Sequence, residues 1–478
     1  MRPPTARHLR VLIPAIAAIA VATPALAGSP PRPADIVDTD ITVTIEEVAT
    51  MPFELGPGFV VFVQQPNLAS PVAIKNKLYL IDQNDAIYRL NRDDGPQKVF
   101  DVDQAPDGLA LDNRQAVLNI APGPTKNTMY VAFTSGTEPT TNTPIYRMPA
   151  PLPGVCCNPA APVPVDDLYR IGTIPDPTLS FLFGTTRTEY QVIYEYDIRG
   201  DSLANPRAIA AFETQSGPTH NGGGMVRLPD GRLLFATGDA LTFGAEGRAA
   251  AQDPAEVVSK LVIVDPDDGS IEIAASGVRN VQLIEYSPDG QYLGFGDIGG
   301  VTAEEVNYVP VADIMETSTI ENFGWGRNLD GFAREGTFYV GPGIPLVGDT
   351  QPPVIAPAPI PEAGFIQPQS QYDRIDPNGG VAVSGPVTSD VSFDQLTALS
   401  TDLASGLLYG STADFDAVDA TVLNVNLVDG DGNDIVGGFN TLAGGRADPR
   451  LFHFPDGSAG VLLETTGTLY RLTEVDTG

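Results

Sequence analysis

Short apolar runs separated by turn-forming residues make up most of this chain, and helical periodicity is rare. Apolar runs rich in Val, Ile and Leu predict strands, which we place at residues 40–47, 77–81, 86–90, 128–133, 191–198, 232–237, 261–264, 407–410, 421–428 and 460–472. Helical spacing of apolar residues occurs only at 254–260 and 393–403, which we interpret as loop decoration. The pattern therefore predicts an all-β fold.

The tripeptide Pro-Asp-Gly punctuates this pattern, beginning at Pro106, Pro229, Pro288 and Pro455. Proline presets φ for the first turn position, and Asp and Gly tolerate the next two, so each copy predicts a hairpin. The run 233–237 after the second copy is apolar at nearly every position, which indicates a strand buried on both faces. Repeated strand–turn–strand units are typical of propeller blades. We expect a six-bladed β-propeller over residues 51–478, at roughly 70 residues a blade.

The N-terminus has the pattern of a secretory signal peptide. Arginines precede an apolar run from Val11 to Ala25, and small residues follow it at Ala25 and Ala27. We expect cleavage near Ala27, a lead segment over residues 28–50, and a secreted or periplasmic protein. The apolar run is too short for a membrane span, and no later run approaches 18 apolar residues.

The charge of the chain excludes some partners. A formal net charge of −33 repels nucleic acid and anionic membranes, whereas it favours cations such as calcium. The two cysteines, Cys156 and Cys157, are adjacent, so the fold does not depend on a disulfide framework. They are either an unremarkable loop pair or a strained ring that offers a flat surface to a cofactor.

His220 is the best-marked candidate for chemistry. It precedes three glycines, Gly222 to Gly224, and the strand that ends at Asp239. Glycines remove side-chain bulk, so a large flat ligand could approach the backbone there. A lone histidine can equally be a structural residue.

Several motifs resemble, in order, those of the soluble pyrroloquinoline quinone (PQQ)-dependent sugar dehydrogenases, the glucose/sorbosone dehydrogenase family. They are HNGGGMVRLPDGRLLFATGDA at 220–240, GVRN at 277–280, GG at 299–300 with EEVN at 304–307, NFGW at 322–325, and GRAD at 445–448. The resemblance is strong between residues 190 and 330 and faint elsewhere.

This resemblance implies a six-bladed propeller that binds PQQ across its channel and oxidises an aldose or related sugar, with electrons passing to a separate acceptor. His220 would be the general base and Arg279 its electrostatic partner. Calcium would anchor the quinone at a loop formed by Gly299, Gly300, Glu304 and Glu305. The residues implied in cofactor binding are Gln115, Asn221, Arg279, Asn280, Trp325 and Arg446. The oligomeric state is left open.

Several of these candidate residues also have a simpler structural interpretation. Arg279 could be a surface cation, and Glu304, Glu305 and Asn307 a solvated loop. Trp325, the one tryptophan, could belong to the core. The acidic run 429–434 has the spacing of a calcium loop, but it could also be a tight hairpin.

Two other functions remain open at this stage. Arg446 is a single arginine where active glucose dehydrogenases have two, so the chain could be a calcium-dependent binding module that has lost quinone binding. A hydrolytic propeller would instead need side-chain carboxylates around a central calcium.

Overall fold

The computed structural model describes residues 36–475, with gaps at 54, 58–63, 92–94, 107, 108, 110, 112–115, 140–142, 147–187, 216–219, 240–249, 301, 327–332, 337, 341–354, 358–363, 375–378, 381 and 389–392. The expected signal peptide, Cys156, Cys157 and Gln115 lie outside the described residues.

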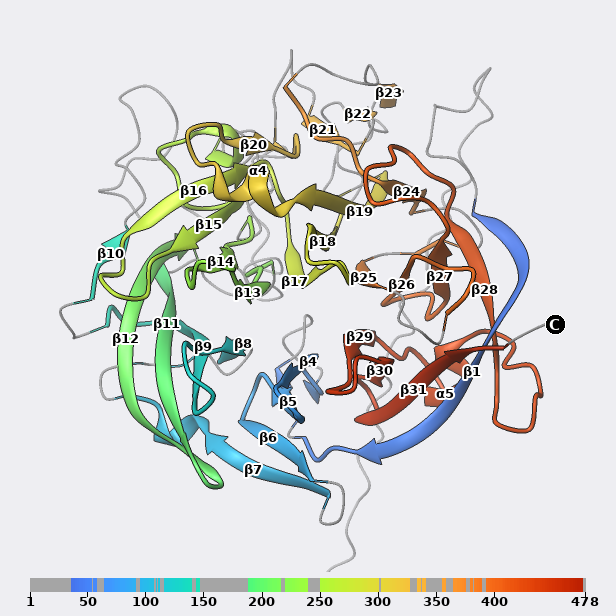
Figure 1. Cartoon of the computed structure of the whole chain (residues 1–478), viewed down its shortest axis with the longest axis horizontal. Coiled ribbons are helices and arrows are strands. Elements are labelled where there is room, and N and C mark those ends of the chain that lie inside the picture. Colours follow the sequence, from blue (N-terminus) through green and yellow to red (C-terminus); the bar gives the residue numbers. More distant parts are fainter. Residues whose placement is uncertain are drawn as a thin grey trace, which may run out of the picture.

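The sheets are arranged around a centre as a propeller (Figure 1). The strands nearest the centre are β4, β8, β13, β17, β25 and β29, and each contacts the next until β29 contacts β4 again. The all-β propeller predicted from the sequence is therefore confirmed.

Four sheets follow the order of the chain. The first contains β4 (Leu68–Ile74), β5 (Lys77–Asp82), β6 (Ala86–Asn91) and β7 (Gly95–Asp101). The second contains β8 (Val117–Pro122), β9 (Thr128–Ser135), β11 (Thr188–Arg199) and β12 (Ser202–Gln215), with β10 (Ile145–Tyr146) at its edge. The third contains β13 (Met225–Arg227), β14 (Leu233–Ala236), β15 (Lys260–Val264), β16 (Ile271–Ser276) and β20 (Glu321–Asn322). The fourth contains β17 (Val281–Tyr286), β18 (Tyr292–Asp297), β19 (Ala303–Pro310) and β24 (Ser370–Asp373).

The fifth sheet has eight strands and joins the two ends of the chain. Its order is β25 (Val383–Thr388), β26 (Ala398–Asp402), β27 (Leu408–Ser411), β28 (Leu423–Val428), β1 (Val37–Thr50), β31 (Thr468–Glu474), β30 (Ala459–Leu463) and β29 (Pro449–His453). Strand β1 pairs in parallel with β28 and antiparallel with β31. It belongs to the sheet, although it lies in the segment expected to be a lead before the propeller.

The remaining elements are short. They are β2 (Gly56–Pro57), β3 (Gln64–Gln65), β21 (Ala333–Glu335), β22 (Phe338–Val340), β23 (Ile355–Pro357), the 3-10 helix Val102–Gln104, α4 (Val311–Met315) and α5 (Phe439–Ala443). Among the helices of the described part, none has the length and apolar character needed to cross a membrane.

Apolar side chains fill the space between neighbouring sheets. Phe212 of the second sheet stacks on Phe235 of the third, with ring centroids 5.6 Å apart, and both belong to one buried cluster. Leu80 of the first sheet shares another cluster with Phe452 of the fifth. Every residue of β14 is buried, as predicted for a strand covered on both faces. The core is therefore a series of sheet-on-sheet contacts around the ring.

The Pro-Asp-Gly copies at 229, 288 and 455 turn the chain from an innermost strand into its neighbour. In the second copy Gly231 has φ +99°, and its N–H donates to the carbonyl of Leu228 at 2.9 Å. In the third copy Gly290 has φ +71° and closes the same kind of turn on Ser287 at 2.8 Å. These three hairpin predictions are confirmed. Glycine occupies the last position of each copy because only glycine reaches such φ values without strain.

Two local expectations are wrong. The helical pattern at 393–403 contains strand β26, since its buried residues pair with β25 and β27 on both sides. The run 460–472 is two strands, β30 and β31, which are joined by a turn at Glu464 to Gly467. In both places pairing with neighbouring strands overrides the local pattern.

Ile45 of β1 offers a test of how strongly this strand holds the fifth sheet. Its side chain is buried in a cluster with Leu472 and Leu427. We expect Ile45→Ala to lower the free energy of unfolding by about 2–4 kcal/mol, through lost burial and a residual cavity. The measurement is chemical denaturation followed by circular dichroism. Val48→Ala is the control, because Val48 lies in the same strand with 42% of its surface exposed. Equal effects of the two changes would contradict the role given to β1.

Candidate active site

The starts of the innermost strands meet at one end of the central channel. A cavity there is lined by residues at or just before the starts of these strands: Leu68, Leu118, Gly222, Gln282, Val383 and Arg450. Its volume is about 20 Å³, which is room for about one water molecule. The sequence places His220 before β13, Arg279 before β17 and Arg446 before β29. These residues therefore belong to the mouth of a filled channel, where a larger ligand would have to bind.

Two backbone segments approach very closely beneath His220. A Cβ added to Gly222 would lie 2.5 Å from the carbonyl oxygen of Ala236, and one added to Gly238 would lie 2.1 Å from that of His220. The segment is tied further by Gln191, whose Nε2 donates to the carbonyls of Asn221 at 2.6 Å and Thr237 at 3.2 Å. The glycines after His220 thus serve backbone-to-backbone contact, which places His220 beside the end of β14.

His220 itself has a left-handed backbone, with φ +65°. For a residue with a side chain this conformation costs about 1–2 kcal/mol. Strain of this kind persists only where surrounding contacts fix it, and it is common at functional sites. Here one such contact is the hydrogen bond that the backbone N–H of Gly222 donates to the side-chain oxygen of Asn280, at 3.1 Å.

The imidazole of His220 lies between a carboxylate and a guanidinium. Its Nδ1 is 2.9 Å from Oδ1 of Asp239, and its Nε2 is 3.4 Å from Nη2 of Arg279. An ionised carboxylate only accepts hydrogen bonds, so Nδ1 carries the proton and Nε2 presents its lone pair. The side chain of His220 is 13% exposed, whereas that of Asp239 is fully buried.

This environment keeps the imidazole neutral. Burial lowers the pKa of His220 below its ordinary value, and the nearby charge of Arg279 lowers it further, while Asp239 opposes both effects. A neutral imidazole with a fixed tautomer, in a side chain that is partly exposed, is the arrangement of a general base.

Arg279 is fixed from several sides and is not a surface cation. Arg279 as a whole is 4% exposed, and its Nη1 donates to the carbonyl of Ile298 at 2.5 Å. The backbone N–H groups of Arg279 and Asn280 both donate to the carboxylate of Asp297, at 2.7 to 3.0 Å. These hydrogen bonds fix the backbone and side chain of Arg279, so that its guanidinium faces His220.

Trp325 packs against this cation. The guanidinium carbon of Arg279 lies 5.2 Å from the centre of its ring, a favourable cation–π contact. The residue is 8% exposed, and its indole N–H has no hydrogen-bond acceptor among the residues that the structure describes. Trp325 is therefore both buried and part of the site, and it retains an unused donor.

The loop expected to bind calcium is held by protein groups. Oε2 of Glu304 accepts from the N–H groups of Gly299 at 3.0 Å and Val383 at 3.1 Å. Its Oε1 is 3.4 Å from Nε of Arg374, and burial raises the pKa of Glu304 to about 7 although Arg374 opposes the shift. Arg374 also donates through Nη1 to the carbonyl of Gly299. This carbonyl, expected to bind calcium, already faces a cation.

The other expected metal and cofactor residues are placed as follows. Oε1 of Glu305 accepts from the N–H of Gly336 at 2.5 Å. Glu304, Glu305 and Asn307 are all buried, so the solvated-loop interpretation is wrong. Gly300 is partly exposed beside Gly299. The Arg446 side chain is 60% exposed and pairs with Asp448 at 2.6 Å.

The acidic run 429–434 forms the tight hairpin that was one of its two interpretations. Oδ1 of Asp429 accepts from the N–H groups of Asp431 and Asn433, both at 2.9 Å. Within the described part of the chain no three His, Cys, Asp or Glu side chains gather as a metal site.

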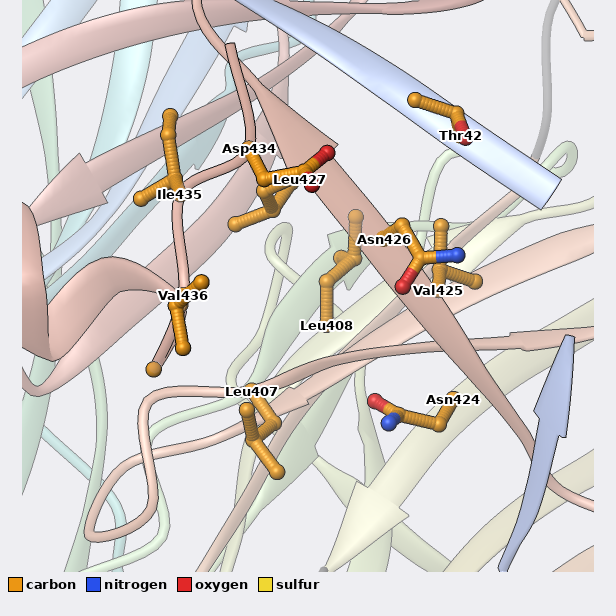
Figure 2. A pocket seen from close by; sticks show the side chains of 12 residues that line it. Thr42, Leu407, Leu408, Asn424, Val425, Asn426, Leu427, Asp434, Ile435 and Val436 are labelled. Carbon is orange, nitrogen blue, oxygen red and sulfur yellow. The ribbon is translucent and has the colours of Figure 1, made fainter. Parts of the chain in front are cut away.

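A larger hollow lies away from the channel mouth, between β28, β1 and residues 434–438 (Figure 2). Its volume is about 360 Å³. Leucine, isoleucine and valine side chains share its lining with Asn424, Asn426, Thr42 and Asp434. Among the described residues, the lining of this hollow contains no histidine, arginine or lysine.

Comparison with known proteins gives a match in fold. No family model matches the chain, and no curated protein matches it in sequence. The PQQ-bound aldose sugar dehydrogenase of Streptomyces coelicolor aligns with a TM-score of 0.50 at 16% identity, over 94% of this chain and 100% of that one. A glucose dehydrogenase aligns with a TM-score of 0.51 at 16% identity, over 91% and 100%. The apo-form soluble aldose sugar dehydrogenase of Escherichia coli gives 0.50 at 15% identity, over 91% and 99%.

The fold is that of the soluble PQQ-dependent sugar dehydrogenases. The resemblance seen in the sequence motifs is thereby confirmed at the level of structure.

Four residues of the site were not predicted from the sequence: Asp239, Asp297, Gln191 and Arg374. Asp239 was within reach, because it directly follows the buried strand of the His220 motif. Gln191 lies in a predicted strand and has no sequence pattern that distinguishes it from an ordinary polar strand residue. Arg374 follows β24 in a region without motifs, and only the fold brings it to Gly299.

The Asp239 contact predicts the direction of one pKa change. Removing the carboxylate by Asp239→Asn removes the interaction that stabilises the protonated imidazole, so the pKa of His220 should fall further. NMR titration of selectively labelled histidine ring C–H groups would measure this. His453, which pairs with Glu285 rather than with this cluster, is the internal control. A His220 midpoint that stays constant or rises would show that Asp239 does not act on the ring.

Proposed function

We propose that this protein is a secreted or periplasmic sugar oxidoreductase that oxidises an aldose or related sugar with PQQ as the hydride acceptor. The observation that carries the proposal is the neutral imidazole of His220, held between Asp239 and Arg279 at the channel mouth. The shared fold with PQQ-dependent sugar dehydrogenases supports it. We also propose that residues 1–27 are the leader that directs export.

The blade count belongs to the same proposal. In the eight-stranded sheet, β25 to β28 form one four-stranded unit, and β29 to β31 form another with β1. Counted in this way, the sheets make six blades around the ring of inner strands.

The residues present fit a flat anionic quinone. PQQ carries carboxylates and carbonyl oxygens, which favour guanidinium and indole N–H donors. Arg279 and Arg374 supply the cations, and the unused indole N–H of Trp325 supplies a neutral donor. When bound, PQQ supplies a quinone carbonyl that accepts hydride.

The chain's own residues would handle the proton. Nε2 of His220 would accept the proton of the sugar's anomeric hydroxyl, while the hydrogen on the same carbon leaves as hydride and a C=O bond forms. The 3.4 Å contact between Nε2 and Arg279 is long, so a substrate hydroxyl could replace it. The buried carboxylate of Asp239 would then stabilise the imidazolium. Arg279 would stabilise negative charge that develops on the acceptor.

Calcium, the second cofactor implied by the resemblance, does not fit two of the four groups assigned to it, the Gly299 carbonyl and the Glu304 carboxylate, in this arrangement. The Gly299 carbonyl accepts from Arg374, Oε2 of Glu304 accepts two backbone hydrogen bonds, and Oε1 of Glu304 faces Nε of Arg374 at 3.4 Å. No step of the proposed mechanism therefore depends on a metal.

Reconstitution tests the proposed function. Purified protein mixed with PQQ should reduce a redox dye when an aldose is added, and a panel of sugars would identify the substrate class. PQQ binding without turnover of any sugar would instead favour a non-catalytic binding module that kept the scaffold.

His220→Gln tests the assignment of the base. We expect turnover to fall about 10²–10⁴-fold, because glutamine cannot accept the proton, while the unfolding midpoint changes little. His453→Gln is the matched control, since His453 bonds to the carbonyl of Thr388 and to Glu285 and is not part of the His220 cluster. Full activity in His220→Gln would refute the assignment.

A further inference from the structure

Arg374 places a guanidinium where the resemblance implies a metal ion. It follows β24, and its backbone N–H donates to the carbonyl of Thr302 at 3.1 Å. From there Nη1 reaches the carbonyl of Gly299, and Nε lies 3.4 Å from Glu304. The side chain is 12% exposed, so it is largely buried between these two acceptors.

A calcium ion and this guanidinium would compete for the same place. Calcium requires six to eight oxygen ligands at 2.3–2.6 Å. An ion on the Gly299 carbonyl would lie at most roughly 5.5 Å from the Arg374 nitrogen that bonds to that oxygen. Two like charges at that separation in a poorly solvated site repel strongly. Glu304 could supply one further oxygen at most: its Oε2 already accepts two backbone hydrogen bonds, and only Oε1, which faces Nε of Arg374 at 3.4 Å, has no hydrogen-bond partner among the described residues.

Arg374 and Arg279 bond to consecutive carbonyls of one loop, Arg374 to that of Gly299 and Arg279 to that of Ile298, so both guanidinium groups lie beside the same backbone turn. The charge of Arg374 contributes to the lowered pKa of His220. Arginine stays protonated at any physiological pH and presents a planar fork of donors that suits carboxylate and quinone oxygens. Its charge also cannot be removed by a chelator.

We propose that Arg374 replaces calcium as the fixed positive charge of this site, so that an anionic cofactor is held by Arg374 and Arg279 without a divalent cation. The part that concerns PQQ rests on the proposed function. The part that concerns metal exclusion rests only on the contacts of Arg374 with Gly299 and Glu304.

The chain's one tryptophan is a reporter for both parts, since Trp325 lies next to Arg279. The first experiment titrates terbium, a luminescent calcium substitute, into protein without PQQ while tryptophan is excited. We expect no saturable sensitised luminescence from the wild-type protein. Arg374→Gln should gain it, with displacement by calcium, and Arg374→Lys should not because it keeps the charge.

The matched control is Arg199→Gln. Arg199 is 61% exposed and pairs with Asp197 on the β11–β12 hairpin, so its loss changes net charge equally without touching the site. Saturable, calcium-displaced luminescence from the wild-type protein would overturn the proposal. So would a folded Arg374→Gln protein, with a wild-type circular dichroism spectrum, that gains no signal.

The second experiment measures PQQ affinity from quenching of Trp325, in chelator and in calcium. We expect the wild-type Kd to agree within twofold between the two conditions. Arg374→Gln should weaken binding at least tenfold in chelator, with recovery in calcium. A wild-type Kd that tightens tenfold with calcium would overturn the proposal even if Arg374→Gln fails to fold. If PQQ binds in neither condition, the proposed cofactor is wrong, and the terbium result alone decides the role of Arg374.

Discussion

The close contact between the His220 segment and the end of β14 is the constraint on which the site depends. Gly222 and Gly238 allow it, because any side chain at either position would collide with the opposite backbone. This contact brings the ring of His220 onto Asp239, and the Asp297 carboxylate then fixes Arg279 on the other side. The chemistry of the imidazole is therefore set by backbone packing first and by charge second.

The sequence predicts those features that depend on local pattern. The Pro-Asp-Gly turns and the doubly buried β14 could be read directly, and so could the segment around His220. Asn221 and Asn280 stay predictions as cofactor contacts, and the structure gives Asn280 a structural role, since its side chain bonds to Gly222. The sequence interpretation of the glycines as room for a ligand stays a prediction, whereas the structure shows that Gly222 admits another backbone segment.

Features that depend on distant pairing could not be read in this way. Residues 393–403 have helical spacing, yet flanking strands force part of them into β26. Arg374 has no pattern of its own, and it meets Gly299 only because β24 pairs with β19. The same fold placed a carboxylate and a guanidinium around a loop for which sequence similarity suggested a metal. Scaffold and site chemistry can therefore diverge within one fold.

The position of β1 also bears on how the molecule is made. The strand Val37–Thr50 pairs with Leu423–Val428 and Thr468–Glu474, which are synthesised much later than it is. Such pairing has a very long sequence separation, and contacts of this kind slow folding. The fifth sheet cannot be completed until residues 423–428 and 468–474 have left the ribosome. Until then β1 has no partner strand, and the ring of sheets stays open.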